Sequence, residues 1–198
     1  MIKTTAMLIS ELEGTYSNPK TKIKRLVKEK KLFPIIRGLY ETNNQLHFAS
    51  LAGAIYGPSY VSFHWALGYY GMIPEAVYGV TSATYKKNRS KQYCSTVFGN
   101  YFYRDVPPAV YPLEVRIITL DEGYPIQIAT AEKALCDRLY MQPVQHNLRE
   151  IEEILFENMR LDEDEFARLN FDTIRQIAPL YRCRNLDLFS TFLKRKFF

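Results

Sequence analysis

The sequence predicts an α+β protein in two parts, and three observations support that prediction. Helix-type periodicity followed by β-type residues fills the first 43 positions, helix and strand patterns alternate from there to about residue 145, and residues 146–198 are helical in pattern. The 198 residues are 47% apolar and 24% charged, which is typical of a folded globular protein with a real core. We therefore expect an N-terminal domain over residues 1–43 and a C-terminal domain over residues 44–198.

The first domain is expected to begin with two short helices. Residues 4–13 place apolar side chains three to four positions apart, which indicates an amphipathic helix that Gly14 ends. Asn18 and Pro19 form a helix start, because an Asn side chain caps unpaired N–H groups and Pro tolerates the first helical position. The second helix is expected over residues 19–31.

A β-hairpin should follow the second helix. Residues 32–36 and 39–41 are rich in β-forming side chains and flank Arg37-Gly38, where glycine permits a turn with positive φ. The order helix, turn, basic helix, hairpin is that of a winged helix-turn-helix. In such a domain the second helix enters the major groove of DNA and the hairpin reaches beside it.

Positive charge is concentrated on the second helix. The stretch from Asn18 to Lys31 holds seven Lys or Arg residues and one Glu. Residues 1–40 carry nine basic and three acidic side chains, a net charge of +6, whereas residues 41–198 carry −1. A helix face that is merely solvated usually mixes Glu with Lys, because like charges four positions apart destabilise a helix. The pattern therefore favours a polyanionic partner.

Double-stranded DNA is the polyanion that this helix fits. Lys and Arg on phosphates supply affinity through counterion release, so six contacts cost about a thousandfold in affinity between low and physiological salt. Sequence selection needs contacts to base edges, for which we expect Asn18, Thr21 and Arg25. The expected DNA-binding residues are Asn18, Lys20, Thr21, Lys22, Lys24, Arg25, Lys28 and, at the hairpin tip, Arg37.

The second domain is expected to alternate helices and strands. Residues 45–56 are helical in pattern, and Ser62 is placed to cap a helix that closes at Gly71. Strands are expected over residues 77–84 and 101–106, on either side of a polar loop, and as a hairpin over residues 115–120 and 125–129 around a turn at 121–124.

The remaining segments are helical in pattern. Thr130 can cap a helix over residues 131–141, and residues 148–159 form another. Asp162 followed by Glu165 is a capping box. The tail, residues 146–198, is therefore expected to be helical to its end.

The sequence contains no recognisable catalytic motif. The three His and three Cys residues share no metal-ligand spacing, and phosphate-binding glycine loops and nucleophile motifs are missing from the sequence. A metal-dependent nuclease is the main enzymatic alternative, since such enzymes can carry a metal-binding acidic residue followed by Glu-x-Lys. Here Glu-x-Lys occurs only at Glu29–Lys31, at the end of a basic helix and not on a strand beside an aspartate, which disfavours a nuclease. We expect a protein that is not an enzyme and has no metal site and no cofactor.

A membrane role is disfavoured. The longest apolar run, Trp65–Ile73, is far shorter than the roughly 20 residues of a spanning helix, and the N-terminus does not read as a secretory signal. A basic helix that lies on a membrane usually has aromatic residues opposite its charge, and Asn18–Lys31 has none. We expect a cytoplasmic protein with no membrane partner.

An RNA-binding alternative rests on Tyr101 and Tyr103, which alternate on a predicted strand beside a basic loop. Aromatic side chains on strands can stack on single-stranded bases. Packing of both rings in the core is the better interpretation, since alternating aromatics on a strand usually face an apolar layer.

Several stretches resemble the AbiEi antitoxin family of type IV, abortive-infection toxin-antitoxin systems. The central one is SYVSFHWALGYYGMIPEAVYGVTSAT, Ser59 to Thr84, which matches the family's Ser-Tyr-(Ile/Val)-Ser, Ala-Leu helix, Gly-(Leu/Met)-Ile-Pro-Glu and Val-Thr-Ser pattern. FGNYFYRDV (Phe98–Val106), IATAEKALCDRLY (Ile128–Tyr140) and KIKRLVKEKKLFPIIRGLYE (Lys22–Glu41) resemble the same family. Together they cover about residues 17–140 in family order.

The resemblance implies a winged-helix domain that binds the promoter of its own operon and represses it. It also implies a C-terminal antitoxin domain that neutralises a nucleotidyltransferase-type toxin, functionally and without a stable complex. The alternative is a nucleic-acid-binding transcriptional regulator or RNA-binding protein without a toxin partner. Candidates for the antitoxic contact surface are the basic residues of the polar loop, Lys86, Lys87, Arg89 and Lys91.

The chain departs from the family pattern at two places. The family commonly has Gly where Lys30 stands, which suggests that the basic helix ends differently or runs longer here. Only one helix fits before the basic one, so we expect a DNA-binding module that is abbreviated or completed by residues 45–56.

Overall fold

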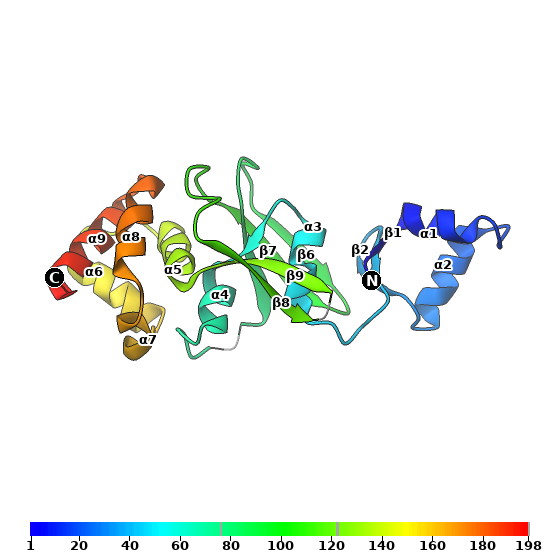
Figure 1. The fold of residues 1–198 in the computed structure, drawn as a ribbon, viewed down its shortest axis with the longest axis horizontal. Coiled ribbons are helices and arrows are strands. Elements are labelled where there is room, and N and C mark those ends of the chain that lie inside the picture. The colour runs from blue at the N-terminus through cyan, green and yellow to red at the C-terminus, as the bar shows by residue number, and fades with distance from the viewer. Residues whose placement is uncertain (76, 122, 198) are drawn as a thin grey trace.

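The computed structural model describes residues 1–75, 77–121 and 123–197, and it is an α+β fold. Figure 1 shows an elongated molecule with the N-terminal elements at one end, a β-sheet with flanking helices in the middle, and a group of helices at the other end. The first 41 residues therefore lie far from the last 50 along the long axis.

The N-terminal unit contains five elements: β1 (Lys3–Thr4), α1 (Thr5–Leu12), α2 (Pro19–Lys28), β2 (Phe33–Ile36) and β3 (Leu39–Glu41). Both helices and the hairpin were predicted, whereas the two-residue β1 was not; it pairs with β3 in an antiparallel sheet of order β1-β3-β2. Leu8, Ile23 and Leu32 form the unit's small buried core. Gly38 has a φ of 87° in the hairpin turn, as the sequence indicated.

Helix α2 ends three residues earlier than the sequence predicted. The N–H of Lys31 donates to the carbonyl of Leu26 (3.0 Å) and that of Lys30 to Val27 (3.1 Å), which is the Schellman pattern of a helix end. Lys30 takes the left-handed conformation, with a φ of 54°. The helix therefore closes with a left-handed cap at Lys30, and the expectation that Lys in place of Gly makes it end differently or run longer is wrong.

Glu41 joins the N-terminal unit to the middle of the molecule. Its carboxylate is completely buried and accepts hydrogen bonds from the Tyr124 hydroxyl (2.9 Å), the backbone N–H groups of Thr42 and Asn43, and the Met1 ammonium. Burial raises the pKa of this carboxyl, but the hydrogen bonds outweigh burial and hold the pKa below its usual value.

A mixed sheet forms the middle of the molecule. Within the described residues it has six strands in the order β6-β7-β5-β4-β9-β8. The strands are β4 (Tyr60–Val61), β5 (Gly79–Thr84), β6 (Lys91–Ser95), β7 (Gly99–Asp105), β8 (Val115–Asp121) and β9 (Tyr124–Ala129). β5 pairs in parallel with β7, and the predicted hairpin of β8 and β9 is confirmed. The turn predicted at 121–124 includes residue 122, which lies outside the described residues.

Strand β6 corrects the prediction of a polar loop, which the sequence KKNRSKQ placed over residues 86–92. Lys91 and Gln92 begin an edge strand that pairs antiparallel with β7 from Lys91↔Tyr103 to Ser95↔Gly99. Its far end reaches the N-terminal unit, where the Ser95 hydroxyl donates to the carbonyl of Pro34 (3.3 Å).

Four helical segments pack on this sheet: η1 (Phe48–Leu51), α3 (Ala52–Ile55), α4 (Phe63–Tyr69) and α5 (Ala131–Tyr140). Tyr101 and Tyr103 are fully buried beneath η1 and α3, and their hydroxyls donate to the carbonyls of Phe48 (3.0 Å) and Ala52 (2.7 Å). The core-packing interpretation of these tyrosines is confirmed, and their use as an RNA-stacking platform is wrong.

Helix α5 carries a buried ion pair that the sequence analysis did not predict. The side chains of Lys133 and Asp137 lie one helical turn apart and are both 0% exposed. Nζ of Lys133 is 3.0 Å from Oδ1 of Asp137. Asp137 also accepts the hydroxyls of Tyr60 (3.0 Å), Ser62 (2.7 Å) and Tyr181 (2.6 Å). Ser62 occupies the N-cap position of α4 as predicted, but its side chain makes no cap bond and serves Asp137 instead. This network ties α5 to the sheet and to the tail.

The tail is helical, as expected. Its helices are α6 (Leu148–Glu152), the π-helical η2 (Glu153–Asn158), α7 (Glu163–Ala167), α8 (Phe171–Ile177), η3 (Ala178–Tyr181) and α9 (Arg184–Phe197). Asp162 caps α7 by accepting the N–H of Glu165 (2.9 Å), while its own N–H donates to Met72 and not to a capping-box Glu. None of the helices in the described ranges is long and apolar enough to cross a membrane.

Candidate nucleic-acid interface

The sequence of helix α2 explains where the helix starts and which of its sides is buried. Asn18 caps it, with Oδ1 accepting the N–H of Thr21 (3.1 Å), and Pro19 fills the first helical position. Ile23 is 4% exposed and packs toward α1. Because residues advance by about 100° around a helix, burial of this side turns the basic residues outward.

The outward side of α2 is a ridge of cations, which we call the basic ridge. Its members Lys20, Lys24 and Lys28 repeat every four residues, are exposed, and form no ion pair within the described residues. Thr21 and Arg25 lie beside them and are also exposed. The structure therefore brings together five of the predicted DNA-binding residues on one side of one helix.

Two basic side chains of α2 have partners of their own. Arg25 pairs with Glu29 (2.6 Å), a hydrogen bond that raises the pKa of the arginine and lowers that of the glutamate. Glu29 also forms an ion pair with Lys31, whose Nζ is 3.3 Å from Oε2 of the glutamate. Lys22 is half-buried, with its Nζ 4.7 Å from the centre of the Tyr16 ring. Separation of Arg25 from Glu29 would cost little free energy, because the pair is in solvent.

Asn18 and Arg37 stand at the margins of the ridge. The capping bond uses one of the two acceptor sites of Asn18 Oδ1 and does not involve the Nδ2 donors. Arg37 is exposed in the β2–β3 turn, beside Gly38, whose carbonyl accepts the N–H of Thr5 (2.9 Å). This bond ties the hairpin tip to the start of α1.

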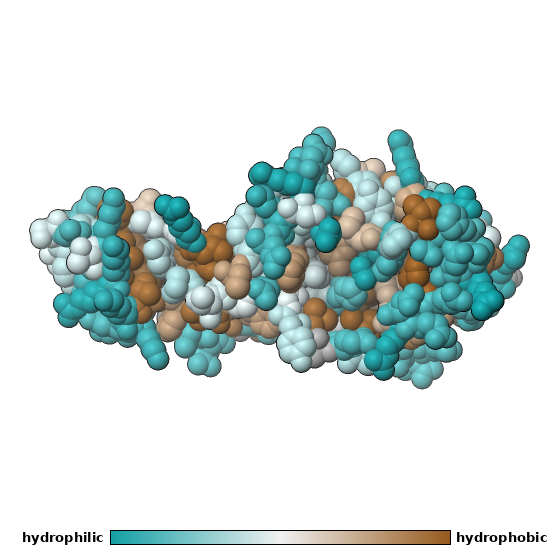
Figure 2. Space-filling view, turned by 180° about the vertical axis from the view of Figure 1, so that it is seen from behind, coloured by the Kyte–Doolittle hydropathy of each residue, from teal (hydrophilic) through white to brown (hydrophobic). Residues whose placement is uncertain are grey.

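The basic ridge is not covered by the acidic part of the chain. Residues 147–168 carry eight acidic and three basic side chains, and Figure 1 places them at the opposite end of the molecule from α2. Figure 2 shows the N-terminal unit from behind as a lobe with hydrophilic side chains over much of its surface.

The loop between β5 and β6 holds the second predicted basic group. Asp105 organises it, because its carboxylate accepts the Thr84 hydroxyl (2.6 Å) and the N–H groups of Lys87 (2.6 Å) and Asn88 (2.7 Å). Lys86 and Arg89 are exposed, while Lys87 and Lys91 are half-buried. The Nζ of Lys87 lies against the Tyr56 ring and donates to the carbonyl of Gly57 (3.3 Å).

This loop is not part of the basic ridge. It lies at the Lys91 end of β6, and the Ser95 end of that strand touches the N-terminal unit, so about 13 Å of strand separates the loop from that unit. The structure therefore keeps the two predicted basic groups apart.

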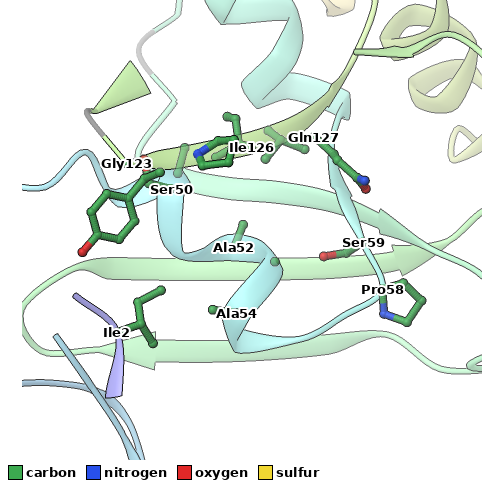
Figure 3. A pocket seen from close by; sticks show the side chains of 14 residues that line it. Ile2, Ser50, Ala52, Ala54, Pro58, Ser59, Gly123, Ile126 and Gln127 are labelled. Carbon is green, nitrogen blue, oxygen red and sulfur yellow. The ribbon is translucent and has the colours of Figure 1, made fainter. Parts of the chain in front are cut away.

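A cavity of about 430 Å³ lies between the N-terminal unit and the sheet. Figure 3 shows Ile2 on one side of it, Ala52 and Ala54 on α3, and Ser59 and Gln127 at the other side. No charged side chain is among the described residues that line it. It is therefore separate from both basic groups.

The described ranges contain no cluster of three or more His, Cys, Asp or Glu side chains that could hold a metal ion. The sequences of known protein families and of curated proteins were compared with this chain, and neither comparison gave a match.

Proposed function

We propose that this protein is a DNA-binding antitoxin of the AbiEi type that represses its own operon. The observation that supports the DNA-binding part is the basic ridge, three exposed lysines with Thr21 and Arg25 beside them on the exposed side of a capped helix. A short helix, a turn, this basic helix and a hairpin follow one another, which is the order of a winged helix-turn-helix without its first helix.

The proposed mechanism is docking of α2 in the major groove. Lys20, Lys24 and Lys28 neutralise phosphates, and Thr21 and Arg25 face the base edges. Phosphate contacts fix the register, and the bidentate fork of an arginine supplies discrimination among bases. Repression follows by occupation of the promoter, in the cytoplasm, and requires no cofactor and no catalytic step.

The antitoxic part of the proposal rests on the four stretches that resemble the family. The residues proposed for it lie on the β5–β6 loop, where Lys86 and Arg89 project from a backbone that Asp105 fixes. The proposed target is a nucleotidyltransferase-type toxin, countered without a stable complex.

Two experiments test the two parts separately. A duplex from upstream of the protein's own gene should shift in a gel and remain uncut in magnesium or manganese; cutting that a chelator abolishes would replace the proposal with a nuclease. The second experiment begins with the neighbouring reading frame, which should encode a nucleotidyltransferase whose expression alone arrests growth. Co-expression of this protein should then restore growth, and arrest that persists at full protein expression would reduce the protein to a regulator without a toxin partner.

A further inference from the structure

Two arginines that the DNA-binding proposal does not use face the same cavity. Arg104 on β7 and Arg138 in the last turn of α5 line a space of about 210 Å³ together with Phe63, His64, Thr81, Phe102 and Met141. None of these lining residues carries a carboxylate. The cavity is therefore positively charged and walled by aromatic and apolar side chains.

Among the described residues, Arg138 has no carboxylate as a counter-charge. Its Nε is buried and has no hydrogen-bond partner in the described ranges, although more than nine in ten buried polar groups are usually paired. Neither Arg138 nor Arg104 forms an ion pair with any carboxylate of the described residues. Burial lowers the pKa of Arg138 and the charge of Arg104 lowers it further.

Arg104 is exposed and donates from one Nη to the Ser90 hydroxyl (3.1 Å), whereas Arg138 is partly buried, so an anion between them would offset the repulsion of the two guanidinium groups. The position of Arg138 near the C-terminus of α5 favours its charge electrostatically, but that effect leaves Nε unpaired. Two arginine forks on one cavity match the oxygens of a phosphate, which accepts bidentate hydrogen bonds from each.

The cavity continues into a second hollow of about 410 Å³. The two share His64, Thr81 and Phe102, and the second is also lined by Ile73, Val77, Tyr78, Gly79 and Met159. The Phe102 ring lies against Gly79, where an added Cβ would come within 2.7 Å of it, and Tyr78 is 91% exposed at the rim. Glu75 lines this second hollow and is paired with Arg160 (3.0 Å).

We propose that this cleft binds a nucleoside phosphate, with the phosphate between Arg104 and Arg138 and the base in the neighbouring hollow against Phe102 and Tyr78. The two hollows together have the size of an ordinary ligand pocket, about 300–1,000 Å³. An aromatic ring between a cationic end and an apolar end is the arrangement that a base and its phosphate require. The basic ridge of α2 takes no part in this site.

Calorimetric titration of the full chain with AMP, ATP, adenosine and inorganic phosphate tests the proposal. AMP or ATP should bind saturably and more tightly than adenosine or phosphate. Arg104→Gln and Arg138→Gln should each weaken nucleotide binding at least about tenfold, the loss expected for a charged hydrogen-bonding partner. Phe102→Ala should weaken AMP binding and leave the response to phosphate unchanged.

The matched control is Arg149→Gln, which removes an exposed arginine from α6 and should leave binding unchanged. Arg104 is exposed, so its variant keeps the test valid if the Arg138 variant unfolds. The proposal is overturned if no nucleotide binds at millimolar concentration, or if both arginine variants bind as the wild type does. It is also overturned if a single-stranded RNA oligonucleotide binds through these arginines while AMP and ATP do not.

Discussion

At the scale of single residues, the structure uses side chains in ways that sequence pattern does not reveal. Lys133 and Asp137 have the appearance of a solvated i,i+4 pair, yet both are completely buried. The reason is tertiary: the hydroxyls of Tyr60, Ser62 and Tyr181 come from other elements to satisfy the carboxylate. Arg138 was missed for the same reason, since only the fold places it beside Arg104.

Removal of Lys133 should destabilise the protein strongly. Lys133→Met leaves the Asp137 carboxylate buried without its cation, and we expect a loss of about 3–5 kcal/mol in the free energy of unfolding. Urea denaturation followed by circular dichroism measures it. Lys86→Met, on an exposed side chain, is the control and should change stability by less than about 0.5 kcal/mol; equal effects of the two substitutions would contradict a structural role for the buried pair.

Lys30→Gly should stabilise the protein. Lys30 has a φ of 54°, a conformation that costs a side-chain-bearing residue about 1–2 kcal/mol and glycine almost nothing. After allowance for the greater freedom of glycine in the unfolded chain, we expect a gain of about 1 kcal/mol, read from the urea midpoint. Lys30→Ala removes the same charge and retains the strain, so a similar gain in both variants would assign the effect to charge.

His64 should make stability depend on pH. Burial lowers its pKa to about 4, with a contribution from Arg138 that Glu75 opposes. The unfolded chain takes up the proton near pH 6.5 and the folded chain only near pH 4, so this contribution to stability is complete above pH 6.5 and is lost as pH falls toward 4. His64→Gln should reduce the loss between pH 7 and pH 5 by about 1 kcal/mol, a figure discounted because the side chain is partly exposed.

The control for that prediction is His146→Gln, at an exposed position. If His64→Gln and wild type lose the same stability between pH 7 and pH 5, His64 is not kept neutral by its surroundings.

At the scale of elements, the sequence predicted what is decided locally. The caps at Asn18 and Thr130 form as predicted, and Asp162 caps α7 without the reciprocal bond of the predicted capping box; each cap is a bond within four residues. The hairpins were predicted from their turns for the same reason. Strand β6 was missed because Lys91–Ser95 has little β-type pattern of its own, and pairing with β7 makes it a strand.

In the candidate site, too, features that depend on local sequence could be predicted and features that depend on tertiary packing could not. The exposed side of α2 could be predicted, since Ile23, Leu26 and Val27 mark the opposite side. The separation of α2 from the Lys86–Lys91 loop could not, because it depends on the direction in which β6 leaves the N-terminal unit.

Asp105→Ala should loosen the loop between β5 and β6. The carboxylate holds the N–H groups of Lys87 and Asn88, and each charged hydrogen bond contributes about 1.5–3 kcal/mol. Hydrogen exchange of these two amides, measured by NMR, should accelerate by at least about tenfold. Asp172→Ala, on the exposed surface of α8, should leave both rates unchanged, and unchanged rates in the Asp105 variant would show that the loop is held by other contacts.

At the scale of the whole molecule, the two ends of an elongated fold carry opposite net charge. The first 40 residues carry +6, and residues 147–168, at the other end of the long axis, carry −5. Under the proposed function, this separation would orient the protein toward a polyanion with α2 leading and would keep the acidic end away from phosphates. The sequence contained both charge blocks, but the distance between them depends on the packing of the middle sheet.

The salt dependence of duplex binding tests the central claim, that the basic ridge exists to lie against DNA. Fluorescence anisotropy of a labelled duplex from upstream of the gene should give a steep fall of affinity with salt for the wild type. The variant Lys24→Ala/Lys28→Ala should bind more weakly, with a slope of log K against log salt that is shallower by about two, one for each lost phosphate contact. The control Lys194→Ala/Arg195→Ala removes the same charge from exposed positions on α9 and should match the wild type. An α2 variant with the wild-type slope and affinity, or a control that weakens binding equally, would contradict the account.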